Sequence, residues 1–337
     1  MIDNIKITLR KFKGNLSDNP NLESHGQSFG SEIYRLYNHE GKDKDIYLLL
    51  KYNPKKQVLK IENSIRKWYL GGFSLLDLTE KTATKAFGKI SKKLNISISE
   101  LHKATFTQCE IGLNIRTRIP VDDIVPMIVR YSTFKRYQFG VETVGFEGTD
   151  LKLKMYDKCE ELLVHNKKYD KKAKKKAFKA LADRNYNFFR IEFNMFDKQS
   201  FINKDLSYIK NIGHILDNYL ELYSFWTKEM SRVTLLNKLI MSKKMTPKQY
   251  VIARVLEIDG FTSFEHNCLK RGKGNTSSRI INEAIEVIHC FGNLSQYNTN
   301  KFKLDIVRNL KRIKKKEENL DINLLTKSLF HSSDSIN

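Results

Sequence analysis

The sequence predicts an α+β fold, a mainly antiparallel sheet with packed helices, followed by an all-helical C-terminal domain. Stretches in which apolar and polar residues alternate, as in half-buried strands, recur before residue 200 and are clearest at 105–116, 151–156 and 186–196. After residue 204 the apolar spacing becomes helical. We therefore expect an α+β domain at 1–200, a helical domain at 201–330 and a frayed tail at 331–337.

The composition narrows the function to proteins that bind polyanions. The chain has 337 residues, with 60 lysines and arginines against 38 acids, which gives a net charge of +22. Such an excess favours nucleic acid as the partner, and an anionic membrane surface is the other candidate. The four cysteines form no CxxC pair, which disfavours a disulfide framework or a zinc ribbon and fits a reducing compartment. Without a signal peptide or a membrane-length apolar run, we expect a cytoplasmic protein with no membrane contact.

The chain order supplies further expected elements. Residues 1–11 alternate as a strand, 14–30 are polar and loop-like, and 46–62 hold two apolar runs joined by a turn signal, Asn53-Pro54. Asp77 and Glu80 have capping-box spacing, which predicts a helix to about residue 94. Further helices are expected at 121–131 and 159–182, and a hairpin should join 138–146 to 151–156. Four helices, at 205–230, 247–258, 263–269 and 276–291, should precede the last one, at 305–316.

Three of the predicted strands combine an apolar face with a face that carries particular polar groups. Because side chains alternate along a strand, the polar faces should converge on an open floor if the strands share one sheet. Two carboxylates there could hold a divalent cation, and a tyrosine could attack a phosphodiester, helped by a neighbouring ammonium. The competing interpretation is that Glu110 with Lys158, and Arg190 with Glu192, form ordinary cross-strand ion pairs. The groups are Glu110 and Asn114 on the first strand, Tyr156 and Lys158 on the second, and Arg190 and Glu192 on the third.

Several basic segments are candidate DNA contacts. Residues 63–73 place cations beside aromatic rings and a Gly-Gly pair, which suits backbone and base contact, although the rings could equally close the core. Eight lysines between 167 and 179 indicate a DNA-backbone surface rather than an ordinary solvated face. A basic turn after 263–269 is compatible with a helix-turn-helix reader and with a plain bundle. The candidates are Arg66, Lys67, Trp68, Lys152, Lys154, Lys171, Lys172, Lys175, Arg190, Lys270, Arg271 and Lys273.

Together these stretches resemble a known family. The segment VGFEG followed by LKLKMYDKCEEL resembles the surroundings of the catalytic tyrosine in rolling-circle replication initiators of small plasmids and filamentous phages, the Rep-trans and gene II/X group. The matching positions are Gly145, Gly148, Tyr156, Lys158 and Glu161. NSIRKWYLGGFSLLDLT, CEIGLNI and FFRIEFNMF resemble other blocks of the same family, so that the resemblance covers about the first 200 residues.

The resemblance implies a Rep nickase-like domain that nicks one DNA strand at an origin. Tyr156 would stay on the 5′ phosphate, Lys158 would assist, and the 3′ hydroxyl would prime synthesis. The implied cofactor is Mg²⁺ or Mn²⁺ held by Glu110 and Glu192, with Glu161 either a third ligand or on the helix behind the site. Glu110 stands where aspartate is common, Asn114 where the family can place a second acid, and the paired histidines of many related nickases are absent.

The partners that this family implies are origin DNA, single-stranded and duplex, a host helicase and polymerase, and a second copy of the chain in a homodimer. One alternative is a non-catalytic origin-binding or regulatory protein on a similar scaffold. Another is a protein that binds RNA or a membrane surface through its lysines alone. The latter leaves the polar faces of the three strands without a role.

Overall fold

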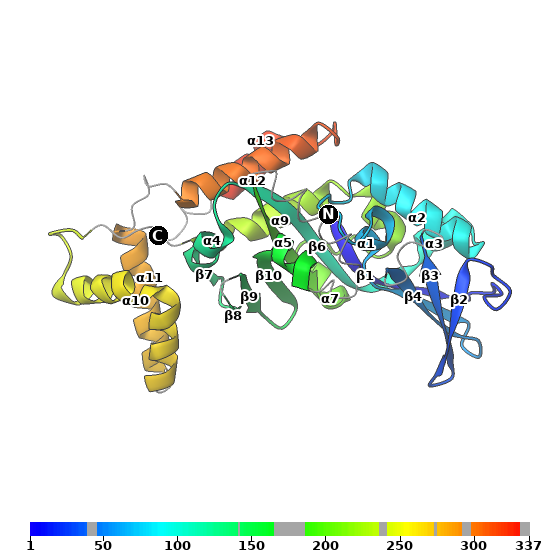
Figure 1. The fold of residues 1–337 in the computed structure, drawn as a ribbon, viewed down its shortest axis with the longest axis horizontal. Helices are drawn as coiled ribbons and strands as arrows, with labels where there is room; N and C mark the ends of the chain where they lie inside the picture. Colours follow the sequence, from blue (N-terminus) through cyan, green and yellow to red (C-terminus); the bar gives the residue numbers. More distant parts are fainter. Residues whose placement is uncertain are drawn as a thin grey trace.

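A computed structural model of the chain describes residues 1–38, 46–140, 142–164, 186–235, 241–272, 275–291 and 298–330. Its centre is a ten-stranded sheet in the order β2-β3-β4-β5-β1-β6-β11-β10-β9-β8, in which every neighbouring pair is antiparallel (Figure 1). The strands of this sheet are β1 (Ile2–Arg10), β2 (Leu22–Ser28), β3 (Ser31–Tyr37), β4 (Tyr47–Asn53), β5 (Val58–Glu62), β6 (Thr105–Thr117), β8 (Lys135–Phe139), β9 (Thr143–Glu147), β10 (Leu151–Asp157) and β11 (Asn187–Met195).

The helices flank this sheet and extend beyond one end of it (Figure 1). A separate two-stranded ribbon pairs β7 (Ile128–Tyr131) with β12 (Val233–Leu235). The helices are α1 (Ile65–Leu70), α2 (Glu80–Leu94), α3 (Ile98–Lys103), α4 (Val121–Met127), α5 (Lys158–Val164), α7 (Lys198–Ile202), α8 (Ile212–Asp217), α9 (Glu221–Ser231), α10 (Pro247–Arg271), α11 (Asn275–Phe291), α12 (Asn298–Lys314) and α13 (Ile322–Phe330).

The apolar face of the sheet packs against helices from the C-terminal half of the chain. On β11, the ring of Phe189 lies edge-on to Phe302 of α12 at 5.7 Å between centroids, and Phe193 meets Phe225 of α9 at the same distance. Such aromatic contacts add specific geometry to the area that they bury. The main hydrophobic core therefore includes both the sheet and the helices α9, α12 and α13. The boundary expected at residue 200 does not divide this core.

Helices α10 and α11 form a second, smaller hydrophobic cluster. Phe261 and Leu256 of α10 are buried in it with Ile288 of α11, and Val129 of β7 also belongs to it. In Figure 1 this pair of helices projects from the end of the molecule that is opposite to β2. The second cluster therefore joins α10 and α11 to β7 rather than to the main core.

The structure confirms the α+β class with a large antiparallel sheet and helices toward the C-terminus. The hairpin between β9 and β10 lies where the turn at 147–150 predicts it. The expected helix at 121–131 ends at Met127, and the expected strand 138–146 is instead the hairpin of β8 and β9. The segment 14–30 contains β2, whose side chains are nearly all exposed, so that no apolar alternation marked it as a strand.

The helical half also differs in its segmentation. The long helix expected at 205–230 is divided into α8 and α9, whereas the two short ones expected at 247–258 and 263–269 are one helix, α10. Thr79, rather than Asp77, caps α2, and its partner in the capping box is Thr82. Most of the helix expected at 159–182, including its eight lysines, and the tail 331–337 lie outside the described residues. Within the described ranges no helix is both long and apolar enough to cross a bilayer.

Candidate metal and tyrosine site

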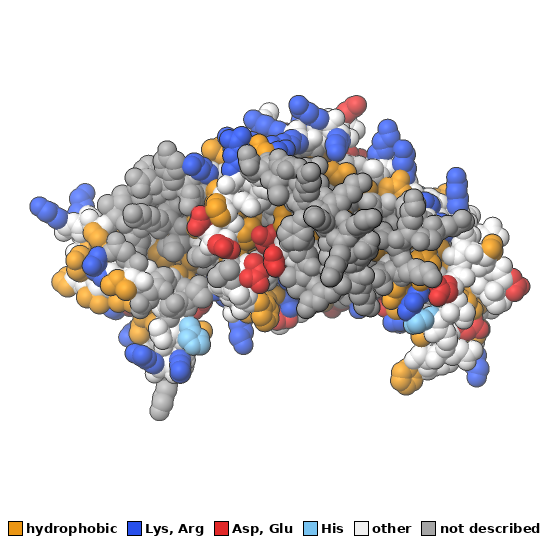
Figure 2. Space-filling model, in the orientation of Figure 1, with side chains coloured by type: hydrophobic (Ala, Val, Ile, Leu, Met, Phe, Trp, Pro, Cys, Tyr) orange, Lys and Arg blue, Asp and Glu red, His pale blue; other side chains and the backbone are white. Residues whose placement is uncertain are grey.

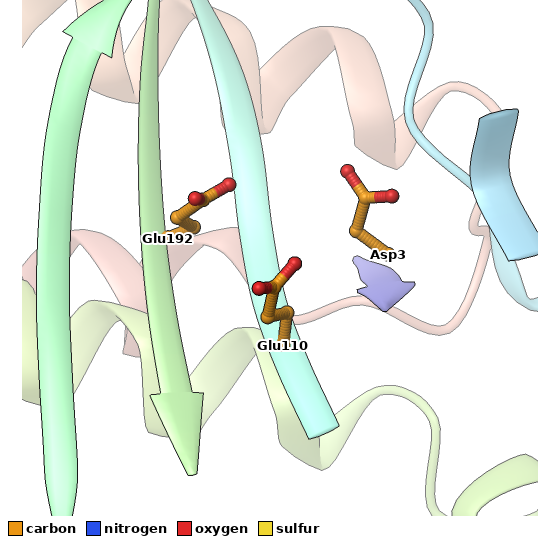
Figure 3. A group of neighbouring side chains, drawn as sticks. All are labelled: Asp3, Glu110 and Glu192. Carbon is orange, nitrogen blue, oxygen red and sulfur yellow. The ribbon is translucent and has the colours of Figure 1, made fainter. Parts of the chain in front are cut away.

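Three neighbouring strands bring three carboxylates together on the polar face of the sheet. Asp3 lies on β1, Glu110 on β6 and Glu192 on β11, and β6 lies between the other two strands. One carboxylate oxygen from each residue lies within 4.8 Å of the other two. Figure 3 shows the side chains extending to the same side of their strands. Oxygen donors at this spacing are the ligand type that hard divalent cations take.

The guanidinium group of Arg190 lies among these carboxylates. It donates to Asp3 Oδ2 at 2.7 Å and to Glu192 Oε2 at 2.7 Å, and it also reaches Asp77 Oδ1 at 3.2 Å. Its side chain is 0% exposed, so these bonds form where water cannot compensate for losing them. Arg66 of α1 is equally buried and donates to Asp3 Oδ2 at 2.9 Å. Two arginines therefore neutralise the acids on the Asp3 side.

Glu110 is the acid of this group that has no cation bound to it among the described residues. Its Oε2 accepts a hydrogen bond from Asn4 Nδ2 at 2.7 Å. Burial, together with the negative charges of Glu192 and Asp3, raises the pKa of Glu110 to about 7. Although burial by itself raises the pKa of Asp3, the charges of Arg66 and Arg190 hold it well below its ordinary range. The site therefore has one carboxyl that is poised to exchange its proton for a cation.

Gly112 provides the room that Arg190 needs. It lies directly opposite Glu192 in the register of β6 with β11. A Cβ atom at this position would lie 2.8 Å from Arg190 Nη2 and 2.9 Å from Glu192 Cβ, both closer than real Cβ atoms approach. A glycine inside a strand often marks such a close approach. The missing side chain of Gly112 is therefore what allows the guanidinium to cross β6 toward Asp3.

Tyr156 on β10 adds a hydroxyl to the carboxylate group. It pairs with Arg190 in the register of β10 with β11, which places both side chains on the polar face. Its hydroxyl donates to Glu192 Oε2 at 3.3 Å, and the side chain is 7% exposed. Burial, followed by the charge of Glu192, raises the pKa of Tyr156 well above its ordinary value. A reaction at this oxygen therefore needs a base beside it, and Glu192 is within hydrogen-bonding distance.

Lys158 and Glu161 form an ion pair beside the tyrosine, at the start of α5. Lys158 Nζ donates to Glu161 Oε2 at 2.5 Å and lies 5.6 Å from the centre of the Tyr156 ring. Burial and the charge of Arg190 lower the pKa of Lys158 to about 8. Lys67 of α1 holds the other oxygen of Glu161 at 2.9 Å. Although burial opposes it, the two lysines lower the pKa of Glu161 to about 2.

The sequence-predicted site residues separate into two groups. Glu110, Glu192 and Tyr156 come together as the alternation of their strands predicts. Glu161 lies outside the group of three carboxylates and is bound to lysines, so that it is the third ligand neither by position nor by charge. Asp3 instead completes the group of three carboxylates. A signal for it existed, because aspartate is depleted in strands and Asp3 stands in the first one.

The polar face is more closed than expected, and three of the expected DNA contacts are interior side chains. Trp68 is 1% exposed, and its indole nitrogen donates to the carbonyl oxygen of Leu36 at 2.9 Å. Arg66 and Arg190 are each 0% exposed and bind acids instead. Burial therefore excludes these three side chains from direct contact with DNA in this conformation. The sequence could not separate them from surface cations, because basic and aromatic residues serve both roles.

The other basic candidates are at least partly accessible where the structure describes them. Lys67, Lys152 and Lys154 are partly buried around the site, and Lys270 and Arg271 are exposed at the end of α10. Lys154 Nζ lies 4.7 Å from the centre of the Tyr156 ring, which puts a cation directly beside the candidate nucleophile. The remaining candidates, Lys171, Lys172, Lys175 and Lys273, lie outside the described residues.

The competing interpretation, of cross-strand ion pairs, holds for neither of its two pairs as expected. Arg190 and Glu192 do form an ion pair, at 2.7 Å, although both residues lie on the same strand. Lys158 pairs with Glu161 rather than with Glu110. Comparisons of the chain with known protein families, with curated proteins and with solved structures find no match.

Proposed function

We propose that the protein is a metal-dependent DNA nicking and joining enzyme that initiates rolling-circle replication, with Tyr156 as its nucleophile. The observation that carries the proposal is the hydrogen bond of 3.3 Å from the Tyr156 hydroxyl to Glu192 Oε2. Glu192 belongs to the group of three carboxylates, so that a nucleophile, a base and a cation site share one face of the sheet. The net charge of +22 supports DNA as the substrate.

The chemistry is a transesterification. The phenol proton passes to Glu192, the Tyr156 oxygen attacks a phosphorus atom, and the bond between phosphorus and the 3′ oxygen breaks. The leaving 3′ oxygen takes a proton, which Lys158 can supply because its pKa is lowered to about 8. The products are a 5′ phosphotyrosine and a 3′ hydroxyl from which a polymerase can extend. Reversal of the same steps joins the strand again.

The donor set fits Mg²⁺ or Mn²⁺. The three residues offer only carboxylate oxygens, which favours hard cations over zinc. Glu110 Oε1 and Glu192 Oε1 accept no hydrogen bond from any described residue, so both are available as ligands. A bound cation would polarise the phosphate and neutralise its developing charge. Asp3 would contribute the third oxygen in competition with Arg190, which already binds Asp3 Oδ2.

The arrangement around Arg190 favours one alternative, a non-catalytic origin-binding or regulatory protein. In that case Arg190 is the permanent counter-ion of Asp3 and Glu192. Tyr156 would then be an interior side chain, as its 7% exposure allows. This alternative uses the same basic surfaces to bind DNA, but it requires neither a metal nor a covalent intermediate.

The test compares the wild-type protein with Tyr156→Phe on supercoiled DNA that carries the element's own origin, with and without Mg²⁺. We expect the wild type to nick the DNA and to become covalently attached to it only with the metal. The variant should bind the DNA and do neither. Tyr250→Phe is the matched control, because Tyr250 is 48% exposed on α10, a helix that carries none of the three carboxylates. It should leave nicking unchanged.

The two proposals predict different results in this assay. If Tyr156→Phe forms the adduct as well as the wild type does, another residue is the nucleophile and the proposed role of Tyr156 is wrong. If both proteins bind the origin and neither nicks it with Mg²⁺ or Mn²⁺, the non-catalytic alternative replaces the enzyme.

A further inference from the structure

A second cluster of functional groups lies on the polar face, where β6 ends and the neighbouring strand β11 begins. The guanidinium carbon of Arg116, on β6, lies 3.4 Å from the centre of the ring of Tyr186, which directly precedes β11. Arg118 lies 5.4 Å from the same centre, and its Nη2 donates to the Tyr186 hydroxyl at 3.2 Å. Arg312 of α12 lies nearby, because its Nη1 donates at 3.4 Å to Asn309 Oδ1, which also accepts from the backbone N–H of Arg116 at 3.2 Å. We call Arg116, Arg118, Tyr186 and Arg312 the arginine–tyrosine cluster.

The arginine–tyrosine cluster has an uncompensated positive charge. Within the described ranges, none of its three arginines has a carboxylate oxygen within 4.0 Å. The neighbouring acid, Asp305, is bound to Arg308 at 2.9 Å and accepts a hydrogen bond from the Thr117 hydroxyl at 2.9 Å. The buried Nε of Arg116 has no hydrogen-bond partner among the residues that the structure describes. The hydrogen bond from Arg118, together with the charges of Arg118 and Arg116, lowers the pKa of Tyr186. A cluster that stabilises a phenolate in this way would also stabilise another oxyanion.

The position of the cluster connects it to the candidate site. In the register of β6 with β11, Arg116 pairs with Phe188 and Asn114 pairs with Arg190, so that Arg116 lies on the same face as Arg190 and Tyr156. Tyr186 precedes Arg190 by four residues, which corresponds to about 13 Å along a strand. A strand of DNA that lies along this face could therefore contact both the cluster and the candidate site.

We propose that the arginine–tyrosine cluster is a phosphodiester-binding site for single-stranded DNA. Its arginines carry planar groups of donors that match phosphate oxygens, which suits backbone contact without base readout. This inference rests on the proposed function for the identity of the strand, which would be the one that Tyr156 cuts. The α12 helix continues the surface, because Arg308, Lys311 and Arg312 are exposed. Figure 2 shows Lys and Arg side chains gathered along the upper edge of the molecule, over α12.

The experiment measures how salt changes the affinity for a fluorescent oligothymidine. The double variant Arg118→Gln and Arg312→Gln removes two exposed charges and leaves the stacked pair of Arg116 and Tyr186 in place. Each cation that contacts a single-strand phosphate contributes about 0.7 to the slope of log K against log salt concentration. We expect the slope of the double variant to be shallower by about 1.4 than that of the wild type.

Lys55→Gln with Lys56→Gln is the charge-matched control, because both lysines are exposed in the turn between β4 and β5. The control should keep the wild-type slope. If the two double variants change the slope equally, only the net charge matters and the inference is overturned. An unchanged slope in Arg118→Gln with Arg312→Gln overturns it as well, whatever the nicking assay gives. A shallower slope for Arg118→Gln with Arg312→Gln alone supports the phosphodiester-binding site. This holds even if the wild type forms no adduct in the nicking assay, in which case only the nicking proposal fails.

Discussion

Replacing Gly112 by alanine tests whether the close approach of Arg190 holds the site together. The new Cβ would lie 2.8 Å from Arg190 Nη2, whereas ordinary contact begins at 3.4 Å, so that the guanidinium must move by 3.4 − 2.8 = 0.6 Å. Nη2 is the atom that donates to Asp3 Oδ2 at 2.7 Å. Glu192 Cβ must also move, and it is fixed to the backbone of β11. Overpacking of this kind costs about 1–3 kcal/mol of the free energy of unfolding.

The assay is chemical denaturation of the variant and of a matched control, Gly88→Ala. Gly88 lies inside α2, and a Cβ atom added there would meet no heavy atom of another element within 4 Å, so alanine should stabilise the protein by about 0.5–1 kcal/mol. The same chemical change should thus have opposite signs at the two glycines. If Gly112→Ala is as stable as the wild type, the strands adjust freely and our account of Arg190 is refuted.

Three further predictions concern the charges of the site. Glu110→Gln keeps an acceptor for Asn4, and because burial raises the pKa of Glu110 from 4.5 to about 7, the wild type loses stability as the pH rises through this interval. Chemical denaturation should find the variant more stable than the wild type by about 1–3 kcal/mol above neutral pH and equally stable in acid. Equal stability of the two proteins at every pH would contradict the raised pKa. Mg²⁺ should raise the Tm of the wild type in a thermal scan and leave that of Glu110→Gln unchanged, with EDTA reversing the effect; a similar rise in both proteins would place the cation elsewhere. Arg190→Met leaves Glu192 buried without its counter-ion and Asp3 with Arg66 alone, and it should destabilise the protein by about 3–5 kcal/mol in chemical denaturation. A change below about 1 kcal/mol would mean that the pairs are not strongly coupled.

The alternation of apolar and polar residues was sufficient to predict most of the sheet and part of the site. On β6, β10 and β11 the pattern has a period of two, and a shared sheet then brings Glu110, Glu192 and Tyr156 to one face. The pattern could not reveal which strands are neighbours. The place of β1 beside β6, and hence the role of Asp3, depends on pairing between residues far apart in the sequence.

The role of each cation was the least predictable property. Arg190 and Arg118 are the same residue type, yet one is enclosed by acids and the other lies at the surface. Whether an arginine is buried depends on whether acids lie opposite it in the sheet. That follows from the register of the strands rather than from the local composition. Gly112 is the informative local signal, since a glycine in the interior of a strand indicates that another group comes close.

The central position of β1 has a consequence for the order of folding. The hairpins β4–β5 and β9–β10 join residues that are close in sequence, and such short loops close at little entropic cost. The pair β6–β11 joins Cys109 to Met195, and β1 joins Ile5 to Cys109, so that both pairings must close long loops. Non-local pairings of this kind slow folding. The carboxylates of Asp3, Glu110 and Glu192 therefore meet late, after the hairpins on either side have formed, and a nascent chain has no complete site until β11 has been synthesised.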